Sequence, residues 1–116
     1  MIKLFDSELK IMELLWREGA VSAKQISILA SGEIGWNKNT TYTVIKKLIE
    51  KNVVKREEPG FVCSALIGRD EVQREETNRL IEKLWGGSKK AFFAAFVDEH
   101  LSQDEIDELK SLIEKR

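Results

Sequence analysis

The stretch NKNTTYTVIKKLIEKN, residues 37–52, decides how the rest of the chain is interpreted. Projected at about 100° per residue, it forms a helix with two unlike faces. The face predicted to pack on a core consists of Thr41, Val44, Ile45 and Leu48. The opposite face carries amides, hydroxyls, a phenol and ammonium groups. The stretch therefore predicts a helix that packs with one side and presents hydrogen-bonding groups with the other.

Positive charge is concentrated in this stretch and directly after it. Residues 37–56 hold six Lys and Arg against one Glu, a local charge of +5, whereas the whole chain has a formal charge of −1. Residues 1–68 carry +2 and residues 69–116 carry −3. A local basic patch, more than a high overall pI, indicates a polyanion as partner.

Two helices are predicted before the stretch. The first begins at Asp6, a suitable N-cap, and ends at Gly19. The second begins at Ser22, which forms an S-x-x-Q capping box with Gln25. Both are amphipathic, with apolar residues at helical spacing, and so we expect them to share one core with the helix of residues 37–52.

A β-hairpin is predicted after the stretch. Residues 53–56 and 61–67 form two β-branched or aromatic runs, and Pro59-Gly60 lies in the turn between them. Three helices followed by a hairpin is the element order of a winged helix-turn-helix. We expect a mainly α protein with a small β-hairpin wing.

Residues 69–116 are predicted to form three further helices, the second capped by Ser88 and the third opened by an S-x-x-E capping box at Ser102. The segment AFFAAFV, residues 91–97, is apolar all round and so should be buried on every side. Fewer than 50 residues cannot easily bury such a helix alone, so a second copy of the chain is the simplest cover. We therefore expect a winged-helix domain in residues 1–68 and a helical dimerisation domain in residues 69–116. The predicted dimerisation residues are Leu84, Trp85, Phe92, Phe93, Phe96, Leu109, Leu112 and Ile113.

The outer face of residues 37–52 has side chains suited to reading DNA. The major groove admits one α-helix, and hydrogen-bond donors, acceptors and contacts with the thymine methyl distinguish the bases there. In helix-turn-helix proteins the N-terminal residues of the recognition helix meet the base edges. The predicted base-reading residues are Asn39, Thr40, Tyr42, Thr43 and Lys46. The predicted phosphate contacts are Lys38, Lys47, Lys51 and, in the hairpin, Lys55 and Arg56.

Three other interpretations are open. The lysines could be a solvated helix face with a Lys46–Glu50 ion pair. A winged-helix adaptor could bind protein through the hairpin and use the third helix only as core. An enzyme is the least favoured, because Cys63 and His100 are far apart in sequence and no nucleophile has a plausible base. Cys63 is expected to be a half-buried apolar side chain, and we expect no metal and no cofactor.

The chain shows no signal for a membrane. No apolar run reaches the roughly 18 residues that a spanning helix needs, and the N-terminus lacks the apolar core of a signal peptide. One cysteine fits a reducing compartment. We expect a cytoplasmic protein without membrane insertion.

With these residues the chain resembles the penicillinase repressor family, of BlaI/MecI type, over nearly its whole length. The resemblance rests on the order of DSELKIMELLW, VSAKQI, the GW before NKNTTYTVIKKLIEKN, KRE, CSALI and LWGGSKKAFFAAFVDEHLSQDEIDEL. It implies a dimeric transcriptional repressor that binds an inverted-repeat operator of TACA/TGTA type. In that family the third helix reads the major groove, which carries over onto the base-reading residues named above.

The resemblance also implies a mode of regulation. Family repressors that control β-lactam resistance are inactivated through a membrane sensor whose signal leads to cleavage at an Asn-Phe bond. That bond corresponds here to Ala95-Phe96, where the asparagine is missing. Cleavage at Ala95-Phe96 by a sensor-activated protease therefore remains a hypothesis that the resemblance supplies.

Overall fold

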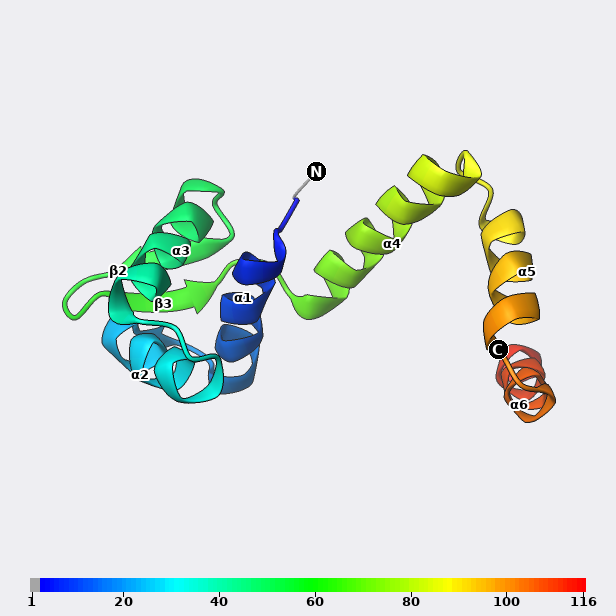
Figure 1. Ribbon diagram of the computed structural model, residues 1–116, viewed down its shortest axis with the longest axis horizontal. Helices are drawn as coiled ribbons and strands as arrows, with labels where there is room; N and C mark the ends of the chain where they lie inside the picture. The colour runs from blue at the N-terminus through cyan, green and yellow to red at the C-terminus, as the bar shows by residue number, and fades with distance from the viewer. Residues whose placement is uncertain (1–2) are drawn as a thin grey trace. The chain divides into compact units, whose positions relative to one another are not determined.

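The computed structural model describes residues 3–116 and forms a winged helix followed by further helices (Figure 1). The helices of this range are α1 Asp6–Glu18, α2 Ala23–Glu33, α3 Lys38–Glu50, α4 Arg69–Trp85, α5 Lys89–His100 and α6 Gln103–Glu114. Its strands are β1 Val21–Ser22, β2 Val54–Glu57 and β3 Val62–Ala65. The predicted fold class is confirmed. The chain divides into two compact units, Met1–Glu75 and Glu76–Arg116, and α4 contributes residues to both.

The start of α1 differs from the prediction. Asp6 is the first helical residue, and the N-cap is Phe5, so the predicted cap is wrong. Phe5 has no side-chain oxygen, and the helix start is held instead by Glu8, whose Oε1 accepts the Phe5 amide at 2.7 Å. The predicted end at Gly19 is confirmed, with φ at 79° and its amide bonded to the Leu15 carbonyl.

Two side-chain caps and a glycine turn set the starts of α2 and α3. Ser22 Oγ accepts the Gln25 amide at 3.0 Å, and Asn37 Oδ1 accepts the Thr40 amide at 2.8 Å. Between the helices Gly35 has φ of 80° and donates its amide to the Ala30 carbonyl. Because glycine adopts this left-handed conformation without steric cost, the chain turns sharply from α2 into α3.

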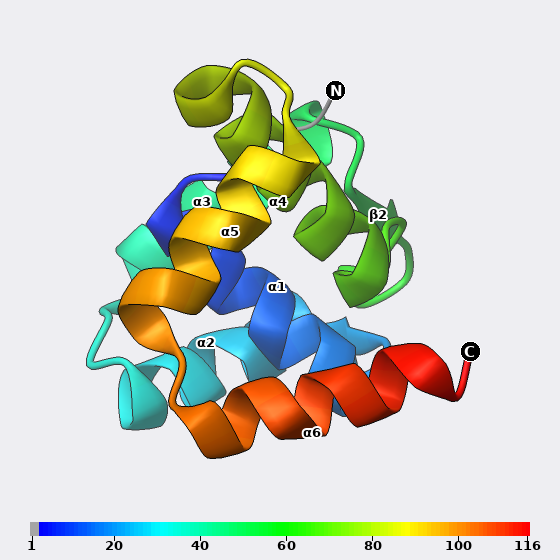
Figure 2. The ribbon, with the colours of Figure 1, turned by 90° about the vertical axis from the view of Figure 1, so that its right-hand side faces the viewer.

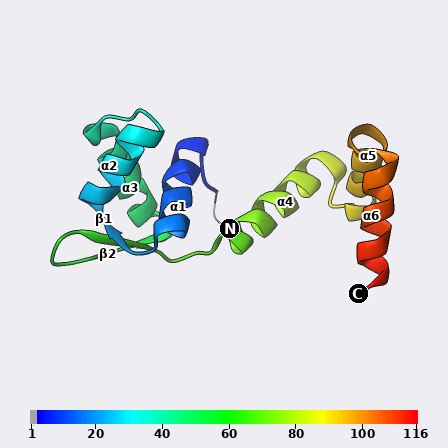
Figure 3. The same cartoon turned by 90° about the horizontal axis from the view of Figure 1, so that it is seen from below.

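The sheet contains one strand more than the predicted hairpin. Its order is β1-β3-β2, and the short β1 pairs Val21 with Cys63 and Ser22 with Val62. Two residues are too few to reveal a strand period, so this strand could not be predicted. Since β3 is the central strand, Cys63 is fully buried and not half-buried as expected, and burial raises the pKa of its thiol. The turn between β2 and β3 extends beyond helices α1, α2 and α3 (Figures 1 and 3).

The core of the first unit lies between α1, α2, α3 and the sheet. Its largest fully buried side chains include Ile11, Met12, Ile26, Ile45 and Leu48. The helical periodicity predicted for these helices is thus confirmed. Packing of this core fixes which side of α3 remains exposed.

The second unit consists of the end of α4 with α5 and α6, and Figure 2 draws α5 in yellow to orange and α6 in orange to red. Ser88 caps α5, and Ser102 with Glu105 forms the predicted capping box of α6. Neither α5 nor α6 has a buried residue. The expectation that α5 is covered on all sides is not met within a single chain, because this unit supplies only α6 and the end of α4 as neighbours.

Candidate nucleic-acid interface

The two faces of α3 have opposite environments. Its inner residues Thr41, Val44, Ile45 and Leu48 are all buried in the core, as predicted. The residues exposed on the outer side are Lys38, Asn39, Thr40, Thr43, Lys46 and Lys47. Their side chains are amides, hydroxyls and ammonium groups, without a carboxylate until Glu50 at the end of the helix. The outer side of α3 is therefore a polar, positively charged surface on a rigid support.

Four of the five predicted base-reading residues lie exposed in α3, and two of them are linked. The Thr43 hydroxyl donates to the Asn39 carbonyl at 2.8 Å, which engages its proton within the helix. The Thr43 oxygen can still accept a bond from a ligand, whereas the Asn39 amide has both donor and acceptor capacity. The fifth residue, Tyr42, is half-buried.

Tyr42 connects α3 to the hairpin. Its ring meets Phe61 edge to face, with centroids 5.9 Å apart and planes at 83°. The ammonium of Lys38 lies 5.7 Å from the Tyr42 centroid, within the range of a cation–π contact. The aromatic contact therefore holds the hairpin beside the N-terminal half of α3.

The hairpin side of the interface is fixed by Arg56, Glu58 and Phe61. The Arg56 guanidinium lies 3.6 Å from the Phe61 centroid and donates from Nε to Glu58 Oε1 at 2.7 Å. Glu58 Oε2 accepts the Phe61 amide at 3.1 Å. Both bonds lower the pKa of Glu58, and the bond from Arg56 has the larger effect. Lys55 forms a looser pair with Glu57 at 3.5 Å.

The local charge of +5 overstates the charge that is free to meet a polyanion. Lys55 and Arg56 pair with the glutamates that directly follow them, and Lys51 pairs with Glu8 at 2.6 Å. The hairpin pairs are exposed and can exchange glutamate for another anion at low cost. Glu8 is buried, so Lys51 cannot leave this pair at a similarly low cost.

The burial of Glu8 was not predicted from the sequence, although the position of this residue in α1 indicates it. It lies in phase with Ile11, Met12 and Leu15, at i, i+3, i+4 and i+7 on the packed face of α1. A charged residue at an inward position requires a partner. The sequence could thus have indicated a buried carboxylate, but not that Lys51 pairs with it.

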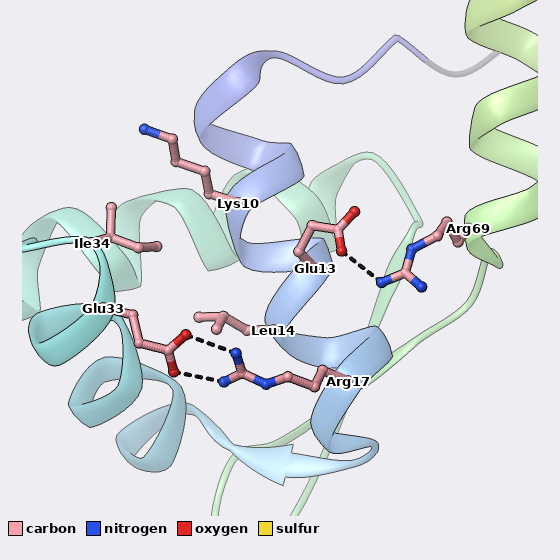
Figure 4. A pocket seen from close by; sticks show the side chains of 7 residues that line it. All are labelled: Lys10, Glu13, Leu14, Arg17, Glu33, Ile34 and Arg69. Carbon is pink, nitrogen blue, oxygen red and sulfur yellow. Dashed lines mark hydrogen bonds and ion pairs between the residues drawn. The ribbon is translucent and has the colours of Figure 1, made fainter.

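A separate hollow of about 320 Å³ lies on the first unit, against α1, the end of α2 and the first residue of α4 (Figure 4). Arg17 holds both oxygens of Glu33, at 2.7 and 2.6 Å, and Arg69 pairs with Glu13 at 2.6 Å. The first of these pairs raises the pKa of Arg17 and lowers that of Glu33. Because these charges satisfy one another, they tie helices together and leave Lys10 as the one basic group of the hollow without such a bond among the residues described.

The second unit presents apolar side chains. Of the predicted dimerisation residues, those classed as exposed are Leu84, Phe93, Phe96, Leu112 and Ile113. Trp85 and Phe92 form an edge-to-face pair with centroids 5.0 Å apart, and both are half-buried, as is Leu109. A hollow of about 220 Å³ between α5 and α6 is lined by Phe93, Val97, Ile106, Leu109, Lys110 and Ile113. Ala95 and Phe96, the predicted cleavage position, lie within α5.

Among residues 3–116 no group of three or more His, Cys, Asp or Glu side chains is arranged to hold a metal ion. Within that range no helix has both the length and the apolar character needed to cross a membrane.

The chain is similar in sequence to several known proteins. The chain is 31% identical to an uncharacterized 16.5 kDa protein in the ptsI 3′ region of Latilactobacillus sakei, over 96% of this chain and 78% of that protein. It is 26% identical to the methicillin resistance regulatory protein MecI of Mammaliicoccus sciuri, over 98% of this chain and 95% of MecI. It is also 26% identical to the penicillinase repressor of Staphylococcus aureus, over 97% and 91% of the two chains.

Solved structures agree on the fold. The DNA-binding domain of the repressor BlaI matches with a TM-score of 0.56 at 22% identity, over 60% of this chain and 87% of that one. The monomeric form of Bacillus licheniformis BlaI in complex with the blaP half-operator matches with a TM-score of 0.54 at 22% identity, over 60% and 88%. The family model described as penicillinase repressor matches residues 4–115. The chain therefore belongs to the penicillinase repressor family.

Proposed function

We propose that this protein is a homodimeric transcriptional repressor that binds an inverted-repeat operator through α3 and the hairpin of each subunit. The observation that carries the proposal is the outer side of α3, which is exposed, polar and basic while its inner side is buried. A hairpin that protrudes beside the N-terminal half of the helix completes a surface suited to a duplex. Repression then requires no chemistry, only occupation of the operator in competition with polymerase.

The base-reading residues in this proposal are Asn39, Thr40, Tyr42, Thr43 and Lys46. An asparagine amide pairs with both N6 and N7 of adenine, a lysine bonds guanine O6 or N7, and a threonine methyl can contact the thymine methyl. These preferences are compatible with half-sites of TACA/TGTA type. That BlaI has been solved with a half-operator supports a DNA partner for a protein of the same family.

The phosphate contacts in this proposal are Lys38, Lys47, Lys55 and Arg56. Lys38 and Lys47 are exposed on α3 at its two ends, and the hairpin residues have exposed partners that a phosphate can replace. Lys51 was predicted to join them, but its ammonium lies on the buried Glu8 carboxylate. We therefore leave it out of the proposed set.

A second copy of the chain is the proposed cover for the apolar side chains of the second unit. An exposed cluster of this kind marks an interaction surface more often than a free one. Residues 1–68 would form the DNA-binding domain, and residues 69–116, from the start of α4 onward, the dimerisation domain. A cytoplasmic location follows from a DNA partner. Cleavage at Ala95-Phe96 stays a prediction, and a protease would reach that bond only after α5 opens locally.

The adaptor hypothesis is the rival of a different class. It requires α3 to serve only as core, and the exposed, basic outer side of α3 counts against it. It predicts that lysines on that side can be removed without effect on any DNA complex.

A pair of matched variants separates the two. We expect Lys46→Ala/Lys47→Ala to weaken binding to an inverted-repeat duplex at least about tenfold at physiological salt, because base and phosphate contacts are both lost. The control Lys89→Ala/Lys90→Ala removes the same charge from exposed positions of α5 and should bind as the parent does. Fluorescence anisotropy measures affinity, and sedimentation confirms an intact dimer. Equal binding by both variants would favour the adaptor.

A further inference from the structure

The C-terminal end of α3 is attached to the start of the chain through one lysine. Lys51 Nζ lies 2.6 Å from Glu8 Oε1 and donates to the Lys3 carbonyl at 2.9 Å. The same ammonium lies 4.6 Å from the centroid of the Phe5 ring. One side chain therefore binds α1 and the segment that precedes it to the last turn of α3.

The environment of the two charges is unequal. The Glu8 side chain is 1% exposed, whereas that of Lys51 is 31% exposed. Glu8 Oε1 accepts both the Phe5 amide and Lys51, and Oε2 is buried with no hydrogen-bond partner among residues 3–116. The ammonium of Lys51 is thus the charge that compensates a buried carboxylate. If it moved to a DNA phosphate, Glu8 would remain buried and uncompensated, which is strongly unfavourable.

The other basic residues near α3 lack this restraint. Lys46 and Lys47 are exposed, and Lys55 and Arg56 pair with exposed glutamates. Lys51 also sits at the C-terminal end of a helix, where the helix dipole favours a positive charge. Its position is therefore stabilised from three sides within the protein.

We propose that Glu8 and Lys51 are a positioning pair that fixes the tilt of α3 on α1, and that Lys51 makes no contact with DNA phosphate. This rests on the proposed function, in which α3 enters the major groove. The N-terminal end of α3 is fixed by the Asn37 cap and by the contact between Tyr42 and Phe61. The pair supplies the second fixed point, at the opposite end of the helix.

The salt dependence of binding to a mixed-sequence duplex tests the second part. Each phosphate contact contributes about 0.9 to the slope of log affinity against log salt. We expect Lys47→Met to reduce the slope by about 0.9 per subunit and Lys51→Met to leave it unchanged. Glu8→Gln removes the buried charge that holds Lys51 and should steepen the slope by about 0.9 per subunit. A Lys51→Met slope reduced as much as that of Lys47→Met would overturn the inference, as would a Glu8→Gln slope equal to the parent's.

Affinity for an inverted-repeat operator duplex tests the positioning. At a temperature where Lys51→Met is folded, we expect specific affinity to fall about tenfold while mixed-sequence affinity is unchanged, and Lys51→Arg should restore it. If Lys51 only added stability, Lys51→Met would lower the melting temperature and leave both affinities intact. That result would contradict a positioning role. If Lys51→Met does not fold, the slope of Glu8→Gln decides. If the affinity of the parent protein did not depend on salt, the proposed function would be refuted. If the parent showed this dependence and Lys51→Met reduced its slope, only this inference would be refuted.

Discussion

At the scale of single residues, basic side chains of similar sequence context have different roles. Lys46 and Lys47 are exposed on α3, Arg56 lies between a glutamate and an aromatic ring, and Lys51 compensates a buried carboxylate. Sequence periodicity predicted which residues of α3 face inward, because that depends only on the local helical period. It could not predict the partner of Lys51, since Glu8 is 43 positions away in the chain. Charge counted along a sequence therefore overestimates charge available to a partner.

The Arg56–Glu58 bond makes a prediction about pH. Arg56 lowers the pKa of Glu58 below its ordinary value of 4.5, so the ionised form is favoured in the folded state. The stabilisation of the hairpin is present above pH 4.5 and is lost as the pH falls through the lowered pKa. Carboxyl chemical shifts measured by NMR should give a Glu58 midpoint below 4.5, and Arg56→Met should raise it. A midpoint that Arg56→Met leaves unchanged would show that this bond is not formed in solution.

At the scale of elements, the caps and turns were more predictable than the pairing of strands. Ser88 and Ser102 cap helices as their sequence patterns predicted, because a cap involves residues only three positions apart. Ser22 also caps its helix, but without the reciprocal bond from the Gln25 side chain that the predicted capping box requires. The start of α1 departed from this rule because Glu8 supplies the bond and Phe5 occupies the cap position. Strand β1 was not predicted, since its pairing with β3 joins residues about 40 positions apart in sequence.

The Asn37 cap makes a prediction for α3. Asn37→Ala should lower the free energy of unfolding by about 1 kcal/mol, because the Thr40 amide loses its acceptor. The proposed base-reading residues begin two positions later, so operator affinity should fall as well. Urea denaturation measures the first effect and anisotropy the second. Asn37→Ser keeps an acceptor and is the matched control; if it behaved like Asn37→Ala, the cap would not be the cause.

At the scale of the whole molecule, the two units pose different problems of burial. The first unit encloses a core of fully buried side chains, whereas α5 and α6 bury none. The all-round apolar character of α5 could be predicted from sequence, but what covers it could not, because the cover is not within one chain. The proposed second subunit would cover these helices and would also provide the second half-site contact that an inverted repeat requires.

A charge placed on that apolar surface should separate the subunits. Ile113→Glu puts a carboxylate on a position that is 61% exposed in one chain but covered in the proposed dimer. We expect sedimentation to show a monomer at concentrations where the parent is a dimer, and operator affinity to fall to that of a single half-site. The control Ile28→Glu changes an isoleucine of α2 that is 56% exposed and should remain dimeric. Dimeric Ile113→Glu would argue against this surface as the interface.

The measurement that most directly tests the account is the binding of the full chain to an inverted-repeat TACA/TGTA duplex as a function of salt, with a scrambled duplex as reference. Four phosphate contacts per subunit predict that log affinity falls with log salt at a slope of about −7 per dimer. The account further predicts two chains per duplex and tighter binding to the inverted repeat than to the scrambled sequence at every salt concentration. A slope near zero on both duplexes would contradict it.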